Sequence, residues 1–180
     1  MRAKVNHKRY FLDDSTDEIK EKGKVLAAVI CLWQIRNNSL IIEETLYYDE
    51  TGQIGEMMRA VSGYVLTAEG YPTLYIMGDC KWEKGIQHTI EKYNPDYIVV
   101  NCGGAIFPEF SKTEGSIIPD EQEVMRMLDE TPEHITFIAV HMDATDHGQT
   151  SRAILRNEAL HYKIDMKRLL IPEDGECIQL

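Results

Sequence analysis

The sequence lacks the features that would place it in a membrane or outside the cell. None of its apolar runs approaches the roughly 20 residues of a membrane span. The first residues, MRAKVNHKRYFLDDSTDEIK, contain no apolar core of a signal peptide. The four cysteines are far apart and form no CxxC pair, which argues against a disulfide framework and a zinc knuckle. We therefore expect a cytoplasmic protein with reduced thiols and no membrane partner.

Positive charge is also scarce. The chain has 19 Lys and Arg against 30 Asp and Glu, a formal net charge of −11. Nucleic-acid binding depends largely on Lys and Arg facing phosphates, so this balance argues against a nucleic-acid partner. The glycine patterns GxGxxG and GxxxxGK[ST] follow none of the expected strands, which disfavours an unrelated α/β nucleotide-binding domain.

Length and pattern favour one domain that begins with β-hairpins. With 180 residues and 43% hydrophobic content, the chain is long enough for one sizeable core. Residues 1–22 are polar and charged, and we expect a solvated N-terminal segment there, followed by one domain over 23–180. The segments KVLAAVICLWQI and SLIIEETLYY predict one hairpin, and VSGYVLTAEG with YPTLYIMGD predicts a second.

From Asp79 onward, predicted strands and helices alternate. Apolar residues recur with helical spacing between 82 and 93, and further helices are predicted at 120–130 and 150–161. The intervening segments DYIVVN, HITFIAVH and KRLLIP have the apolar character of buried strands. Such alternation is typical of parallel βαβ units, and the sequence therefore predicts an α/β fold.

Polar residues follow three successive predicted strands. Asp79, Asn101 and His141 stand at the ends of these strands, where ligands collect in parallel sheets. The loop HMDATDHG adds Asp143 and His147, so the edge gathers carboxylates and imidazoles that suit a divalent metal such as zinc. For Asp79 taken alone, capping of the following helix is an equally good interpretation.

Four segments of the chain carry a resemblance to a known family. TGQIGEMMRAVSGYVLTAEGYPTLYIMGD, PDYIVVNCGGA, AVHMDATDH and IPEDGE occur in the order found in the C-terminal part of metallo-β-lactamase-fold hydrolases, in particular the branch similar to ascorbate-6-phosphate lactonase. The resemblance runs from about Thr51 to Glu176. It implies an αββα sandwich, of which this chain resembles a shortened, incomplete half with β-hairpins followed by βαβαβα units.

The resemblance also implies roles for individual residues. In that family the Asp of the GD pair bridges two metal ions, which here is Asp79, and a His after a later strand ligates the second metal, which here is His141. Asn101, Gly103 and Gly104 match the NxGGA segment, whose glycines let the backbone approach the site.

The loop after His141 resembles the family as well. Asp143 and His147 match polar positions of that loop, and the resemblance implies that they contact the metal ligands or the substrate.

The chain departs from the family at several ligand positions. The upstream HxHxDH segment, which supplies most metal ligands in the family, does not occur in the sequence. Asp49 stands where a further ligand His is expected, and either Asp49 or His147 is the candidate third ligand beside Asp79 and His141. Cys80 replaces a common Thr, either as a ligand or as a small buried residue.

Two functional hypotheses follow. The first is a metal-dependent hydrolase in which a hydroxide bound to zinc or another divalent metal attacks a lactone, ester or phosphoester, with weak or no activity in this shortened chain. The second is a non-catalytic descendant that acts by binding. In either case the missing half-sandwich leaves an apolar sheet face, and we expect a homo-oligomer or a companion chain to cover it. The only other partner expected is a small-molecule substrate, if the chain is active.

Overall fold

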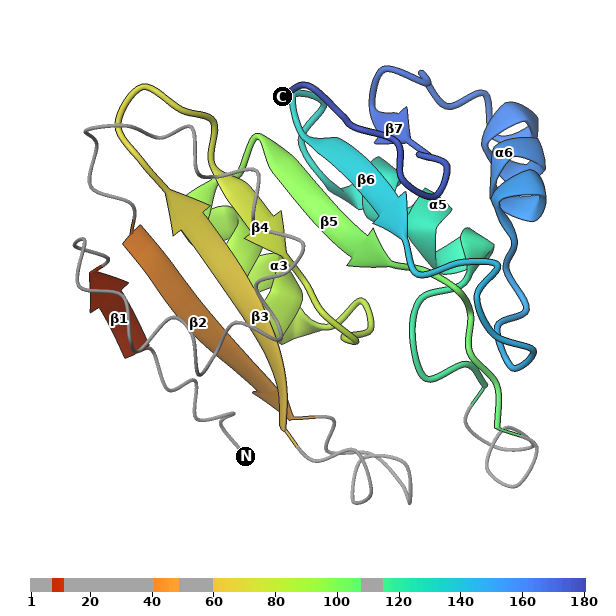
Figure 1. Cartoon of the computed structure of the whole chain (residues 1–180), viewed down its shortest axis with the longest axis horizontal. Coiled ribbons are helices and arrows are strands. Elements are labelled where there is room, and N and C mark those ends of the chain that lie inside the picture. Colours follow the sequence, from red (N-terminus) through yellow and green to blue (C-terminus); the bar gives the residue numbers. More distant parts are fainter. Residues whose placement is uncertain (1–7, 12–40, 49–59, 108–114) are drawn as a thin grey trace.

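A single mixed sheet organises the molecule. The computed structural model describes residues 8–11, 41–48, 60–107 and 115–180. Within these residues, one seven-stranded sheet has its strands in chain order, and three helices pack against it (Figure 1). The strands are β1 Lys8–Phe11, β2 Ile41–Tyr48, β3 Ala60–Thr67, β4 Leu74–Ile76, β5 Tyr97–Asn101, β6 Thr136–Val140 and β7 Leu169–Leu170. The helices are α3 Lys84–Tyr93, α5 Glu121–Glu130 and α6 Arg152–His161. The predicted α/β class is therefore confirmed.

The first four strands are antiparallel. β3 and β4 form the predicted hairpin, closed by a turn in which the Tyr71 amide donates to the Ala68 carbonyl over 3.2 Å. The predicted partner strand KVLAAVICLWQI lies outside the described residues. β2 instead pairs with β3 on one side and with β1 on the other.

Strand β1 differs from the expected solvated N-terminal segment. Its register with β2 places Lys8 opposite Glu44 and Arg9 opposite Glu43. The backbone pairing therefore makes part of the polar N-terminal segment an edge strand of the sheet.

The last four strands are parallel and are joined through the three predicted helices. β4, β5, β6 and β7 pair in parallel, as the alternating pattern predicts. Two of the helices begin at side-chain caps: Asp120 Oδ1 accepts from the Glu123 amide over 2.9 Å, and Ser151 Oγ accepts from the Ile154 amide over 3.2 Å. Among the described residues, no helix combines the length and apolar character needed to cross a bilayer.

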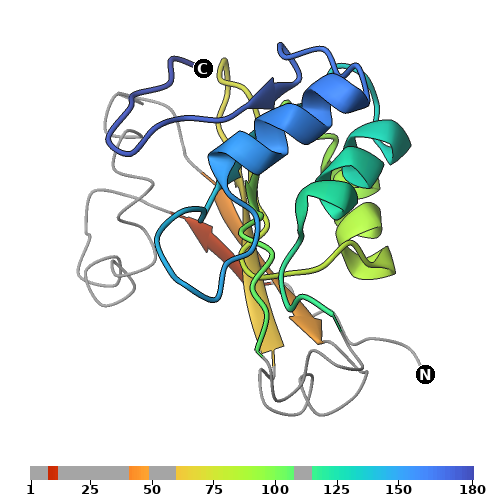
Figure 2. The same ribbon diagram turned by 90° about the vertical axis from the view of Figure 1, so that its right-hand side faces the viewer.

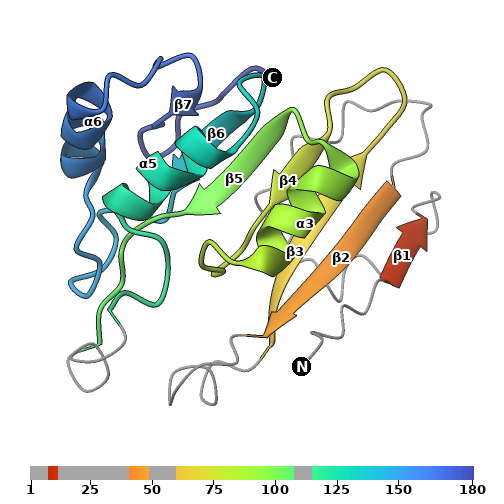
Figure 3. The same ribbon diagram turned by 180° about the vertical axis from the view of Figure 1, so that it is seen from behind.

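One face of the sheet carries the core. α3 and α5 lie on this face, as the edge-on and rear views show (Figures 2 and 3). Successive strands contribute side chains in one register row, each no more than 1% exposed: Val65, Tyr75, Ile98, Phe137 and Leu169. These residues are apolar or aromatic and pack against the apolar stripes of the helices, so burial is concentrated between the sheet and this helical layer.

The opposite face of the sheet is apolar but less buried. Its neighbouring register row contains Ile76, Val99 and Leu170, which are half-buried, and Ile138, which is 7% exposed. The segment after β7 passes across this face in front of β6, whereas α3 and α5 lie behind the sheet (Figure 1). The expectation that an oligomer or companion chain covers this face stays a prediction.

The asymmetry of the two faces predicts unequal costs of truncation. We expect Ile98→Ala, on the helix-covered face, to lower the free energy of unfolding by about 2–5 kcal/mol, because it leaves a cavity in a close-packed core. The matched Ile76→Ala, on the neighbouring strand β4 and the opposite face, should lower the free energy of unfolding by less than about 2 kcal/mol. Urea unfolding followed by circular dichroism measures both. Equal losses would contradict the assignment of the core to one face.

Candidate functional site

Three predicted residues lie at the same edge of the sheet. Because β4, β5 and β6 are parallel, their carboxyl ends meet there, and Asn101 is paired in register with Val140, the residue before His141. The Asn101 side chain donates from Nδ2 to Asp79 Oδ1 over 2.7 Å. Asp79, Asn101 and His141 thus follow three neighbouring parallel strands at one edge, and their roles in a site stay predictions.

The segment that carries Asp79 is held by α5. Lys81 lies 3.3 Å from Glu123, and the Trp82 amide donates to the same carboxylate over 2.5 Å. The Trp82 indole donates from Nε1 to Glu130 Oε2 over 2.6 Å. These contacts fix the residues after β4 against the helical layer, so Asp79 is positioned by tertiary contacts in addition to its bond with Asn101.

His141 is exposed and sits in a backbone conformation that its surroundings must support. Its φ of 64° is in the left-handed region, which non-glycine residues rarely occupy. A Cβ atom on Gly103 would lie 2.3 Å from the His141 carbonyl oxygen and 3.6 Å from Nδ1 of its imidazole. Gly103 is therefore required for the close approach of His141 to β5.

The NCGGA segment is a platform for the loop that follows β6, which we call the His141 loop (residues 141–150). The Thr150 amide donates to the Gly103 carbonyl over 3.0 Å, and the Gln149 amide donates to the Gly104 carbonyl over 3.3 Å. Gly104 has a φ of 56°, and a Cβ there would lie 2.7 Å from Thr150 Oγ1. The backbone of this segment therefore contacts the loop directly, which only glycine permits at these positions.

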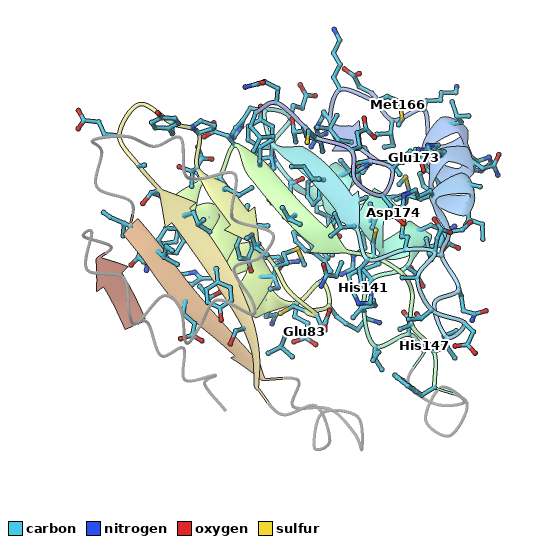
Figure 4. The ribbon with its side chains drawn as sticks, in the orientation of Figure 1. Glu83, His141, His147, Met166, Glu173 and Asp174 are labelled. Atoms are coloured by element: carbon cyan, nitrogen blue, oxygen red, sulfur yellow. The ribbon has the colours of Figure 1, made fainter. Side chains whose placement is uncertain are left out.

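Asp143 and His147 are engaged with partners of their own. Asp143 Oδ2 accepts from Arg152 Nη1 over 2.8 Å. The His147 ring stacks on Phe107 with a centroid distance of 5.1 Å. Figure 4 shows His147 further along the loop than His141, which lies at the end of β6. The predicted ligand role of His147 and the predicted role of Asp143 at the metal or substrate stay predictions.

The described residues alone do not fit a complete metal centre. Among them, no group of three or more His, Cys, Asp or Glu side chains is placed to hold one ion. A catalytic zinc site needs about three protein ligands plus water. Asp49, the other candidate ligand, lies outside the described residues. Within the described residues, Asp79 and His141 are the two candidate ligands at the same edge.

The two cysteines near this edge are buried thiols. Cys80 Sγ donates to the Met77 carbonyl over 3.1 Å, and burial, aided by the neighbouring Asp79 charge, raises the pKa of Cys80 far above its ordinary value. Burial also raises the pKa of Cys102 to about 12. The burial of Cys80 and its bond to the Met77 carbonyl favour the interpretation of Cys80 as a small buried residue.

Arg152 is a residue of this region that the sequence analysis missed. Its side chain is 12% exposed and contacts the His141 loop through Asp143 and the C-terminal turn through Asp174. The hydrogen bond to Asp143 is the main cause that raises the pKa of the Arg152 guanidinium. These partners lie 9 and 22 residues away in the sequence, so no local pattern indicates them.

Comparisons with known proteins agree with the architecture. No family model matches the chain. Over 120 residues it is 32% identical to UPF0173 protein YddR of Bacillus subtilis strain 168, a match that covers 67% of this chain and 45% of that protein. The chain thus spans less than half the length of this curated relative.

Two solved structures are similar in both fold and sequence. One is a possible metal-dependent hydrolase from Veillonella parvula DSM 2008, and the other is an isothiocyanate hydrolase from Delia radicum gut bacteria. Each has a TM-score of 0.70 and 28% identity, and the match covers 78% of this chain and 54% of the other. Together with the curated relative, they support a relationship to metal-dependent hydrolases with a metallo-β-lactamase-like fold.

The close approach at Gly103 predicts a local effect of substitution. Gly103→Ala should shift the amide and imidazole NMR signals of His141 and lower the free energy of unfolding by about 1–3 kcal/mol, because the new methyl group overlaps the His141 carbonyl. Gly115→Ala is the control: its φ is 72°, and no atom lies within 4 Å of its Cβ position. It should cost about 1–2 kcal/mol and leave the His141 signals in place. Unchanged His141 signals in Gly103→Ala would refute the contact.

The raised cysteine pKa values predict selective alkylation. Cys177 is exposed, so iodoacetamide at pH 8 should modify it at least about a hundredfold faster than Cys80 or Cys102. Since the pKa of Cys102 is raised to about 12, its rate should keep rising with pH beyond the point, about pH 9, where an ordinary thiol levels off. Peptide mass spectrometry measures each site separately. Rapid labelling of Cys80 at neutral pH would instead favour a reactive thiolate at the site.

Proposed function

We propose that this chain is a hydrolase of the metal-dependent, metallo-β-lactamase-like lineage, with the edge formed by Asp79, Asn101 and His141 as its site. The observation that carries the proposal is the hydrogen bond from Asn101 to Asp79 at the carboxyl ends of parallel strands, next to the strand that delivers His141. The similarity to two solved structures named as hydrolases supports it. The substrates proposed are lactones, esters or phosphoesters.

The chain's own residues would orient the reacting groups. The bond from Asn101 engages Asp79 Oδ1, and among the described residues Oδ2 accepts no hydrogen bond, which leaves that oxygen for a ligand. The exposed imidazole of His141 stands above Gly103, where the absent side chain leaves room. The pair therefore offers one acceptor oxygen and one ring nitrogen to a small molecule at this edge.

The shortage of ligands sets the expected level of activity. Metal affinity rises with the number of ligands and with the support around them, and the described residues supply two candidates. We therefore propose that any zinc or other divalent metal binds weakly and that hydrolysis is slow in this chain. Asp49, outside the described residues, is the proposed third ligand.

A second substrate class comes from one structural neighbour. The protein from Delia radicum gut bacteria is an isothiocyanate hydrolase and is 28% identical to this chain. The central carbon of an isothiocyanate is electrophilic, as is that of an ester or lactone, so the same edge suits addition of water to it. An isothiocyanate therefore belongs in the substrate panel.

A non-catalytic function is the alternative. It is favoured by the engagement of Asp143 with Arg152 and of His147 with Phe107, which leaves two predicted site residues committed to structural contacts. In that case the edge would bind a small molecule without turning it over.

The proposal predicts a specific dependence on two residues. Asp79→Ala and His141→Ala should each weaken zinc or manganese binding by about tenfold or more, measured by titration calorimetry, and reduce hydrolysis of lactone, phosphodiester and isothiocyanate substrates in parallel. His88→Ala is the control, because His88 is an exposed residue of α3 away from the edge. It should change neither quantity.

The outcomes separate the two functions. Turnover that falls in both edge variants and persists in the control supports the hydrolase. Binding of a small molecule without turnover in the unsubstituted chain supports the alternative. If Asp79→Ala and His141→Ala both behave like His88→Ala, the edge is not the site.

A further inference from the structure

The contacts of Arg152 connect two segments that are far apart in the sequence. Nη1 donates to Asp143 Oδ2 over 2.8 Å, and the Arg152 backbone amide donates to the same oxygen over 3.2 Å. Arg152 is also the first residue of α6, so the loop carboxylate is bound at once by the helix terminus and by the guanidinium.

The other edge of the guanidinium faces the C-terminal turn. Nε donates to the Pro172 carbonyl over 2.7 Å, and Nη2 is hydrogen-bonded to Asp174. Figure 4 shows Glu173 and Asp174 on the segment that passes by β6, with His141 at the end of that strand. The planar Arg152 guanidinium has donors on several sides and therefore contacts both the turn and the His141 loop. A lysine ammonium is a single point charge and would not make both sets of contacts.

The loop needs such support because of its backbone. His141 and Asp143 have φ values of 64° and 59°, so two non-glycine residues within three positions are in the left-handed region. Residues hold this conformation only where surrounding contacts determine it, and such positions cluster at functional sites. Asp143 is two residues from His141, so anchoring its carboxylate restricts the backbone that sets the direction of the imidazole.

We propose that Arg152 is a positioning residue for the site: through Asp143 it fixes the His141 loop, and it makes the C-terminal turn at 172–174 a part of that support. The inference rests on the proposed function only in giving His141 a ligand or substrate-binding role. The mechanical role of Arg152 holds for the chain without any bound metal.

The same helix supplies a matched control. Arg156 lies one turn further along α6 and also binds the C-terminal segment, with Nη2 2.6 Å from Glu173 Oε1 and 3.0 Å from the Ile171 carbonyl. Among the described residues, none of its hydrogen bonds reaches the His141 loop. The two arginines therefore share their helix and their acidic partner segment and differ in the contact with Asp143.

The test compares Arg152→Met with Arg156→Met in the full chain without metal. The amides of Gln149 and Thr150, which dock the loop on Gly104 and Gly103, report on loop opening by hydrogen exchange. Loss of a charged hydrogen bond should speed their exchange about tenfold or more in Arg152→Met. Arg156→Met should leave these rates within about twofold, even if both variants lose similar thermal stability.

A second measurement concerns zinc or manganese affinity. Loss of a residue that supports a ligand typically weakens metal binding about 10–100-fold, so Arg152→Met should raise the dissociation constant by at least tenfold and Arg156→Met should not. Asp143→Asn removes the charged contact while keeping Arg152 on the C-terminal turn. It should reproduce both the faster amide exchange and the weaker metal binding of Arg152→Met. The variant that combines the two substitutions should differ little from either single variant.

Several results would overturn the proposal. Equal loop exchange in Arg152→Met and Arg156→Met would show that Arg152 acts only on overall stability. If Arg152→Met does not fold, unchanged exchange in Asp143→Asn would overturn it equally. If the unsubstituted chain binds no metal, the proposed function loses its support, whereas the exchange rates still decide the role of Arg152.

Discussion

Parallel pairing of β4, β5 and β6 is the constraint on which the candidate site depends. It brings the ends of three strands to one edge and so places Asp79, Asn101 and the start of the His141 loop together, although they come from three separate segments. Helices α3 and α5 lie on one face of the sheet (Figures 2 and 3). The parallel topology therefore decides which residues come together at the candidate site, and the individual side chains decide its chemistry.

Close backbone packing gives that edge its shape. Gly103 and Gly104 accept hydrogen bonds from the amides of Thr150 and Gln149, and Gly103 leaves the space in which His141 approaches β5. Contacts of α5 with Lys81 and Trp82 hold the segment between β4 and α3, which carries Asp79. The candidate ligands thus stand on loops that are fixed by helices and glycines. An edge built in this way needs only a few polar side chains of its own to orient a small molecule.

Local patterns were sufficient to predict the parts of this arrangement that depend on nearby residues. The helical spacing after Asp79 and the apolar strands predicted α3, α5, α6 and the shared edge, because periodicity and caps are local properties. Long-range contacts were not accessible in this way. Nothing in the sequence indicates that Arg152 binds Asp143 and Asp174, that Phe107 stacks on His147, or that a polar segment becomes β1. Which polar group a side chain contacts depends on the folded structure, and it cannot be predicted from the residues next to that side chain in the sequence.

The order of the strands in the sheet has a consequence for how the molecule acquires its structure. Among the described residues, each strand is hydrogen-bonded to its neighbours in chain order, so no connection between these strands skips a neighbour in the sheet. Each pairing then closes only the intervening segment, which keeps the entropic cost of closure low and the contact order modest. Folding can proceed by adding one strand at a time to an existing edge, and each addition sets the register for the next. If strands are added in chain order, the parallel trio at the candidate site is complete when β6 joins, without β7 or the C-terminal turn.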